Sequence, residues 1–291
     1  MNRLAWIRVS RSAPCPVCGR PDWCGTTADG ALCHCMRVPS ARRSRDGGWL
    51  HVLVEMPRER RPDAARAVPV RRDEPDVARF EAWWRERRRL WDWRDCDGLS
   101  LALGVSMESL ERLGACYDPM HSAWAFPMRD GGGRIVGIRL RTYEGRKFAL
   151  TGSRQGIFTP DGLAPDRECG VCVLEGPTDA AAALSLGLPA VGRPSCSGGL
   201  DELAGLFRRI RCRRFTVVAD SDAPKRRPDG SAWYPGREGA EALAEALSRS
   251  LGAPCRVVYP PAKDMRAWLG RGCTRAEFDS VARGARWRVP A

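Results

Sequence analysis

The sequence predicts an α/β protein in which a small metal-binding module precedes a mainly parallel sheet flanked by helices. Apolar runs with strand character alternate with helical patterns between Val171 and Leu269. A Cys-x-x-Cys pair, Cys15 and Cys18, begins a cluster of cysteines near the N-terminus. The 291 residues carry 48 Lys and Arg against 35 Asp and Glu, and this net charge of +13 suits a polyanionic partner. A GC-rich coding bias toward arginine is the alternative explanation of the charge.

The predicted sheet follows from the order of the elements in the C-terminal half. Strand-like runs cover residues 171–174, 215–219 and 256–259, and helical patterns cover residues 179–188, 200–210 and 238–251. Strands that alternate with helices form parallel sheets with right-handed crossovers. Ligands of such sheets bind at the carboxyl ends of the strands, so we expect a site at that edge.

Acidic residues follow each of the three strand-like runs. They are Glu175, Asp220, Asp222 and Asp264. Carboxylates that share one crevice repel one another unless a hard cation such as Mg²⁺ or Mn²⁺ binds their oxygens. The alternative is that these carboxylates lie at strand ends and contact only water. This is the poorer explanation, because several acids are expected at one edge of the sheet. Asp179 either joins this cluster or caps the following helix.

Three acidic motifs in this region resemble the TOPRIM domain, which bacterial-type primases share with type IA and type II topoisomerases and some nucleases. The motifs are Glu175-Gly-Pro-Thr-Asp179, Asp220-Ser-Asp222 and Lys263-Asp264. The resemblance implies a catalytic site in which Glu175, Asp220 and Asp222 bind Mg²⁺ or Mn²⁺. Asp179 and Asp264 are further catalytic candidates, and Glu175 is alternatively the general base. An insertion at residues 223–235 departs from the primase pattern, and we interpret it as a loop over the site.

The N-terminal cysteines have the spacing of a structural zinc ribbon, in which four ligands surround Zn²⁺ tetrahedrally. Cys15 and Cys18 form the first pair, and four residues compete for the two remaining places: Cys24, Cys33, His34 and Cys35. A disulfide-bonded module is the alternative, but no signal peptide precedes the cluster, which favours a reducing cytoplasm. The stretch also resembles the zinc motif of phage- and plasmid-type primases, where Asp-Trp-Cys and Cys-x-Arg follow the first pair. That resemblance implies the ligand set Cys15, Cys18, Cys24 and Cys35.

The middle of the chain predicts a mixed α+β subdomain rich in basic residues. Its first helix places aromatic and basic side chains on one face, namely Phe80, Trp83, Trp84, Arg87 and Trp91. This face either packs into a core or stacks on the bases of single-stranded nucleic acid. Two strands follow at residues 123–128 and 134–141, joined by a glycine-rich turn.

This basic block, including Phe126-Pro-Met-Arg129, resembles the subdomain that precedes TOPRIM in bacterial-type primases. The resemblance implies cations that bind template phosphate or nucleoside triphosphate, namely Arg129, Arg139, Arg141, Lys147 and Arg154. Cations beside a metal cluster also neutralise charge that develops on a transferred phosphoryl group. A solvated basic strand face is the alternative.

The composition places the domain boundaries. We expect a zinc ribbon at residues 1–55, a linker rich in Arg, Pro and Asp at 56–76, the basic subdomain at 77–165, a TOPRIM-like domain at 166–270 and a basic tail at 271–291.

The three domains stand in the order found in primases. The resemblance implies a DNA-dependent primase of a phage or mobile element, which makes short RNA primers de novo on a single-stranded DNA template from nucleoside triphosphates. No phosphate-loop motif is present, so a replicative helicase would act in trans as a partner. We expect no membrane partner and a location in the cytoplasm of a bacterial cell or phage-infected host. The alternatives are a TOPRIM nuclease, a non-catalytic zinc- and DNA-binding protein, and a topoisomerase fragment, for which no tyrosine has a suitable context.

Overall fold

The computed structural model describes residues 6–42, 44, 48–53, 75–90, 96–226 and 232–290. The chain divides into two compact units, Met1–Arg72 and Asp73–Ala291. Of the linker expected at residues 56–76, only the last two residues are described, and Trp91 also lies outside the described residues. Among the residues that are described, no helix is both long and apolar enough to cross a membrane.

The first unit is a four-stranded antiparallel sheet. Its strands follow chain order: β1 (Trp6–Arg8), β2 (Gly25–Thr27), β3 (Leu32–Cys35) and β4 (Trp49–Val52). Side chains alternate across a strand, so Cys33 and Cys35 both lie on the buried face of β3. The sheet closes at β4, where the sequence predicted the end of the ribbon.

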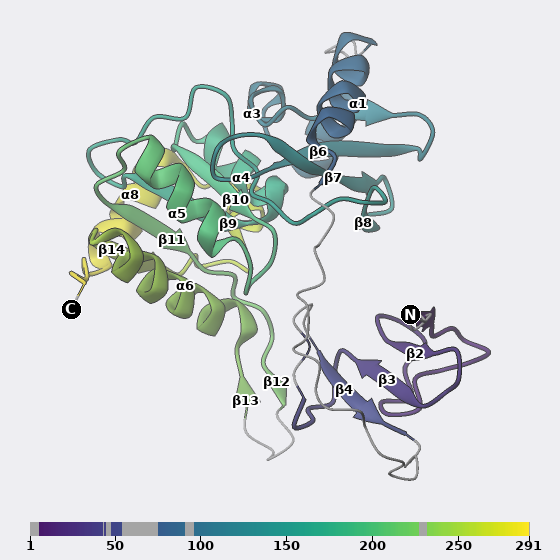
Figure 1. The fold of residues 1–291 in the computed structure, drawn as a ribbon. Coiled ribbons are helices and arrows are strands. Elements are labelled where there is room, and N and C mark those ends of the chain that lie inside the picture. The colour runs from purple at the N-terminus through teal and green to yellow at the C-terminus, as the bar shows by residue number, and fades with distance from the viewer. Residues whose placement is uncertain are drawn as a thin grey trace. The chain divides into compact units, whose positions relative to one another are not determined.

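The second unit begins with helices and an antiparallel sheet (Figure 1). The helices are α1 (Val77–Leu90), α2 (Cys96–Leu103) and α3 (Met107–Arg112), and the sheet contains β5 (Cys116–Asp118), β6 (Ala123–Arg129), β7 (Ile135–Thr142) and β8 (Lys147–Ala149) in that order. The two expected strands are β6 and β7. On α1, Phe80 is buried, and Trp83 and Trp84 pack against the core of this sheet. The tryptophans therefore serve the core and not a base-stacking surface.

The parallel sheet forms the rest of the second unit. Its strand order is β10 (Ala190–Arg193), β9 (Val171–Glu175), β11 (Phe215–Val218) and β14 (Cys255–Val258), and all neighbours run parallel. The sequence predicted three of these strands and missed the edge strand β10. Figure 1 shows helices on both faces of the sheet. They are α4 (Gly176–Ser185), α5 (Leu200–Arg209), α6 (Pro235–Leu251), α7 (Met265–Leu269) and α8 (Arg275–Gly284).

Alternate side chains of the strands face two separate cores. Val171 and Val173 join the core formed with α5 and α6, whereas Cys172 and Leu174 join the core formed with α4, α7 and α8. The second core also contains Trp124 and other residues of the antiparallel sheet. The two sheets of this unit therefore share buried apolar contacts.

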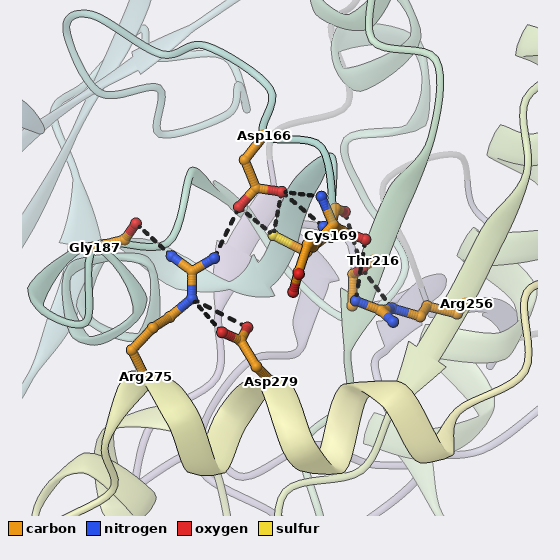
Figure 2. Close-up of polar contacts among 8 residues, drawn as sticks. Asp166, Cys169, Gly187, Thr216, Arg256, Arg275 and Asp279 are labelled. Atoms are coloured by element: carbon orange, nitrogen blue, oxygen red, sulfur yellow. Dashed lines mark hydrogen bonds and ion pairs between the residues drawn. The ribbon is translucent and has the colours of Figure 1, made fainter.

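A polar network closes the amino ends of the parallel strands, opposite the predicted site (Figure 2). Arg275 on α8 lies 3.0 Å from both Asp166 and Asp279, and it also donates to the carbonyl oxygen of Gly187. Arg256 on β14 donates to Thr216 Oγ1 over 3.1 Å. The sequence interpreted residues 271–291 as a basic tail, but in the structure they form α8 and add Phe278 and Ala282 to the core.

The insertion after Asp222 folds as a short hairpin. Strand β12 (Lys225–Arg226) pairs antiparallel with β13 (Ala232–Trp233), and the five residues between them lie outside the described part of the chain. The chain passes from β13 through Tyr234 into α6.

Candidate active site and zinc cluster

Glu175 ends β9 and leads directly into α4. Gly176 follows with φ of +81°, a left-handed conformation that favours glycine and turns the chain sharply from strand to helix. Glu175 is the N-cap residue of α4, but its side chain makes no capping hydrogen bond. The carboxylate instead lines the pocket described below.

Asp220 and Asp222 follow β11 at the same edge of the sheet as Glu175. The strands are parallel and in register, with Val217 opposite Val173, so their carboxyl ends meet. Helix α6 begins tightly against Asp220, because a Cβ on Gly236 would lie 2.4 Å from the carbonyl oxygen of Asp220. Asp222 is more exposed, and its Oδ1 lies 3.9 Å from Lys263 Nζ.

Asp264 and Asp179 connect the same edge to helix α7. Asp264 is the N-cap of α7 and accepts a hydrogen bond of 2.7 Å from the backbone N–H of Ala267. Asp179 is buried on α4 and accepts a hydrogen bond of 3.0 Å from the backbone N–H of Arg266. It therefore joins α4 to α7 and does not cap its own helix.

The acids act on one another electrostatically across this edge of the sheet. Burial raises the pKa of Asp220 to about 8, and the negative charges of Asp179, Glu175, Asp264 and Asp222 add to the shift. Burial and the charge of Asp264 raise the pKa of Asp179 to about 6. Without a counterion, Asp220 therefore holds a proton at neutral pH.

The chemistry of the acids, which are oxygen donors at one edge of the sheet, suits a hydrated divalent cation. Within the described ranges, the only groups of three or more potential metal-ligand atoms within 4.8 Å of one another are the ribbon cysteines. The carboxylates are thus spread more widely than a closed cage. Mg²⁺ commonly binds one or two protein carboxylates and keeps several waters, which suits such a spread set of oxygen donors.

A basic pocket of about 170 Å³ adjoins the acids. Arg139 and Arg141 are two residues apart on β7, so their side chains project from the same face of the sheet. Arg141 also pairs in register with Lys147 on β8. Glu175 and Pro177 also line the pocket. Burial lowers the pKa of Arg139 and of Arg141, and the buried Nε of Arg139 has no hydrogen-bond partner within the described structure. Partly desolvated guanidinium groups of this kind fit a phosphate ligand.

The other two predicted cations lie elsewhere. Arg129 donates to the carbonyl oxygen of Gly133 over 3.0 Å, and its guanidinium lies 5.3 Å from the ring of Trp84. Arg154 is exposed, and it is absent from the pocket lining, as is Arg129. The structure therefore brings Arg139, Arg141 and Lys147 together with Glu175.

The sequence missed one buried cation beside the acids, Arg193. It ends β10 in register with Glu175, and its side chain is only 1% exposed. Its Nη1 donates to the carbonyl oxygens of Cys196 and Gly239 over 2.9 and 3.1 Å. Burial lowers the pKa of Arg193, and the charges of Glu175 and other nearby acids oppose that shift. The missed strand β10 explains the omission, because strand-end position was the signal used for the acids.

In the first unit, the structure gathers Cys15, Cys18, Cys24 and Cys35 with all four ligand atoms within 4.8 Å of one another. This is the ligand set that the sequence favoured, and four thiolates at this spacing fit a structural Zn²⁺. His34 lies on the opposite face of β3, with its ring edge-on to Trp6. Cys33 is fully buried, and its Sγ lies 3.6 Å from Cys15 Sγ, so a fifth thiol adjoins the cluster.

The comparisons with known proteins bear on the fold. No family model and no curated protein matches the sequence. The solved DnaG catalytic core is 16% identical over 70% of this chain and 79% of that chain, with a TM-score of 0.52. The Aquifex aeolicus primase structure, which contains zinc-binding and RNA polymerase domains, is 13% identical over 73% of this chain and 60% of that chain, with a TM-score of 0.54.

The chain has the fold of a primase catalytic core. At these identities the likeness concerns architecture, and the roles of individual residues depend on the geometry of the site itself. Within this primase fold, the acids lie where the parallel strands end, and the basic pocket lies between them and the antiparallel sheet.

Proposed function

We propose that the protein is a DNA-dependent primase that forms short RNA primers on single-stranded DNA. The observation that carries this proposal is the shared position of Glu175, which belongs to the acid cluster and also lines the basic pocket. A nucleoside triphosphate bound there would meet both cations and carboxylates. Template-directed nucleotidyl transfer requires this combination of charges.

Each group of residues has a distinct role in the proposed reaction. Arg139, Arg141 and Lys147 would bind triphosphate oxygens and neutralise charge on the leaving group. Glu175, Asp220 and Asp222 would hold Mg²⁺ or Mn²⁺, which when bound lowers the pKa of the attacking 3′-hydroxyl and polarises the phosphate.

The remaining acids and the ribbon would support this site. Asp179 and Asp264 hold α4 and α7 in place through their bonds to backbone N–H groups, and their charges keep the crevice negative. The zinc ribbon would contact the template. The phage or mobile-element origin, a helicase partner and the exact TOPRIM chemistry are parts of the same proposal.

The test is de novo synthesis with labelled ribonucleotides on random single-stranded DNA, in Mg²⁺ and in Mn²⁺. We expect Glu175→Gln and Asp220→Asn to lower product formation by about 100-fold or more, because each removes a metal-binding charge. Affinity for DNA should change by no more than a few fold. Arg249→Met is the control, since Arg249 is an exposed member of an i,i+4 pair on α6.

Two outcomes would contradict the proposal. Metal-dependent nicking of DNA without primer synthesis would favour the nuclease alternative. DNA binding with no metal-dependent reaction of either kind would favour a non-catalytic binding protein.

A further inference from the structure

We propose that the surface formed by Tyr234, Arg237 and Tyr259 binds single-stranded polynucleotide on the far side of the acids from the basic pocket. We call it the tyrosine–arginine surface. This inference rests on the proposed function for the path of the strand, and it assigns a role to Tyr234, which lies near the end of the insertion.

The surface combines exposed aromatic rings with exposed cations. Tyr234 and Tyr259 are 40% and 38% exposed, and Arg237 is also exposed. Bases of any sequence stack on aromatic rings, while arginine attracts the phosphate backbone. Rings and guanidinium groups in alternation are therefore suited to single strands, whose bases are accessible.

Arg237 holds the two rings in place. Its guanidinium carbon lies 5.6 Å from the centre of the Tyr234 ring and 5.5 Å from that of the Tyr259 ring, within the range of a cation–π interaction. The rings come from the start of α6 and from the end of β14, which are distant in sequence. A preformed pair of rings loses little conformational entropy when a ligand binds.

Two glutamates of α6 lie near this surface, and each is held by a polar contact. Glu241 accepts a hydrogen bond from the hydroxyl of Tyr259 and forms an ion pair with Arg288. Glu238 accepts a hydrogen bond of 3.2 Å from the backbone N–H of Tyr234.

The position of the surface connects it to the site. Strand β11 lies between β9 and β14 in the sheet, so Asp220 separates the Glu175 side of the crevice from the Tyr259 side. The distance from β9 to β14 is two strand spacings, or about 10 Å. The hairpin follows Asp222 directly, and α6 begins against Asp220. A strand that leaves the basic pocket and crosses the acids would therefore reach the tyrosine–arginine surface within a few nucleotides.

The experiment measures binding and involves no synthesis. Fluorescein-labelled 20-mers of single-stranded DNA, single-stranded RNA and duplex DNA are titrated with the full-length zinc-loaded protein, without nucleoside triphosphates, and anisotropy is recorded at several salt concentrations. The variants are Tyr234→Ala/Tyr259→Ala and its matched control Tyr234→Phe/Tyr259→Phe, which keeps both rings. Arg237→Gln is matched by Arg249→Gln on the same helix.

We expect the double alanine variant to bind single strands about tenfold more weakly, and the double phenylalanine variant to bind within twofold of the parent. Arg237→Gln should reduce the slope of log affinity against log salt by about one, whereas Arg249→Gln should leave it unchanged. A larger effect in the DNA arm would identify the ligand as template, and a larger effect in the RNA arm would identify it as product.

The inference would be overturned if the double alanine and double phenylalanine variants bound each single strand with equal affinity. This holds whether that affinity equals the affinity of the parent or is lower. A loss confined to duplex DNA would also overturn the inference. Circular dichroism checks folding, and if the double alanine variant unfolds, Tyr234→Ala and Arg237→Gln decide the question alone. Binding is measured without synthesis, so the two proposals can fail separately. If only the primase proposal failed, no primer would form, but the binding of single strands would still depend on the two rings.

Discussion

Arg193 and Glu175 lie opposite each other in register at the ends of adjacent parallel strands. The guanidinium is buried beside the acid cluster and also binds the carbonyl oxygens of Cys196 and Gly239. One internal cation thus offsets part of the negative charge and fixes the first turns of α6. The acids would repel one another more strongly without it.

Replacing Arg193 should therefore destabilise the protein. We expect Arg193→Met to lower the free energy of unfolding by about 3 kcal/mol, because it removes two hydrogen bonds of a buried guanidinium and takes a positive charge from beside the acids. Urea unfolding followed by circular dichroism measures this. Arg249→Met, on an exposed pair, should change stability by less than about 0.5 kcal/mol. Similar small effects of both substitutions would refute the assignment.

The raised pKa of Asp220 makes stability depend on pH when no divalent cation is added. The folded-state pKa of about 8 lies above the ordinary value of 3.8, so the folded protein binds more protons than the unfolded chain between these values. The stability that the protonated Asp220 side chain contributes is complete below about pH 4 and is lost as the pH rises toward about 8. We expect the melting temperature of the zinc-loaded protein to fall over the upper part of this window, and added Mn²⁺ to restore it.

Asp220→Asn separates this effect from other titrations. It removes the repelled charge, so the metal-free variant should be more stable than the parent at pH 8 and similar to it at pH 4. Added Mn²⁺ should no longer raise its melting temperature. If the variant and the parent show the same pH profile, Asp220 does not carry the titration.

The sequence predicted the site residues that are acidic and also follow the end of a strand. Glu175, Asp220 and Asp264 follow apolar runs, and parallel pairing brings such ends together wherever the sheet forms. Arg193 was missed because its strand, β10, ends in a basic residue and is not followed by an acidic one. Arg129 was expected at the site from the resemblance of its segment to the primase subdomain, but its guanidinium lies against Trp84 and outside the pocket lining. The tail at residues 271–291 looked basic and polar because its apolar residues are few, yet Phe278 and Ala282 anchor α8 in the core.

The fifth thiol of the ribbon permits a test of the zinc ligands. Cys33 and Cys35 share one face of β3, but only Cys35 belongs to the group of four ligand atoms within 4.8 Å. We expect Cys33→Ser to keep one zinc per chain and Cys35→Ser to lose it, because structural zinc requires four deprotonated ligands. Elemental analysis of the purified proteins measures this. Loss of zinc from Cys33→Ser with retention in Cys35→Ser would reverse the assignment.

Arg37 should strengthen zinc binding from outside the ligand set. Its Nη1 lies 3.9 Å from Cys18 Sγ and 3.7 Å from Cys24 Sγ, and its two terminal nitrogens each lie 2.8 Å from an oxygen of Asp22. The guanidinium therefore neutralises two thiolates and orients both cysteines, as groups around a metal site commonly do.

We expect Arg37→Met to weaken zinc affinity by about 10- to 100-fold while leaving one zinc per chain at saturation. Competition with a chromophoric chelator measures the affinity. Arg42→Met, elsewhere in the same unit, is the control, and an equal loss in both variants would show that the effect is one of net charge and not of contact with the thiolates.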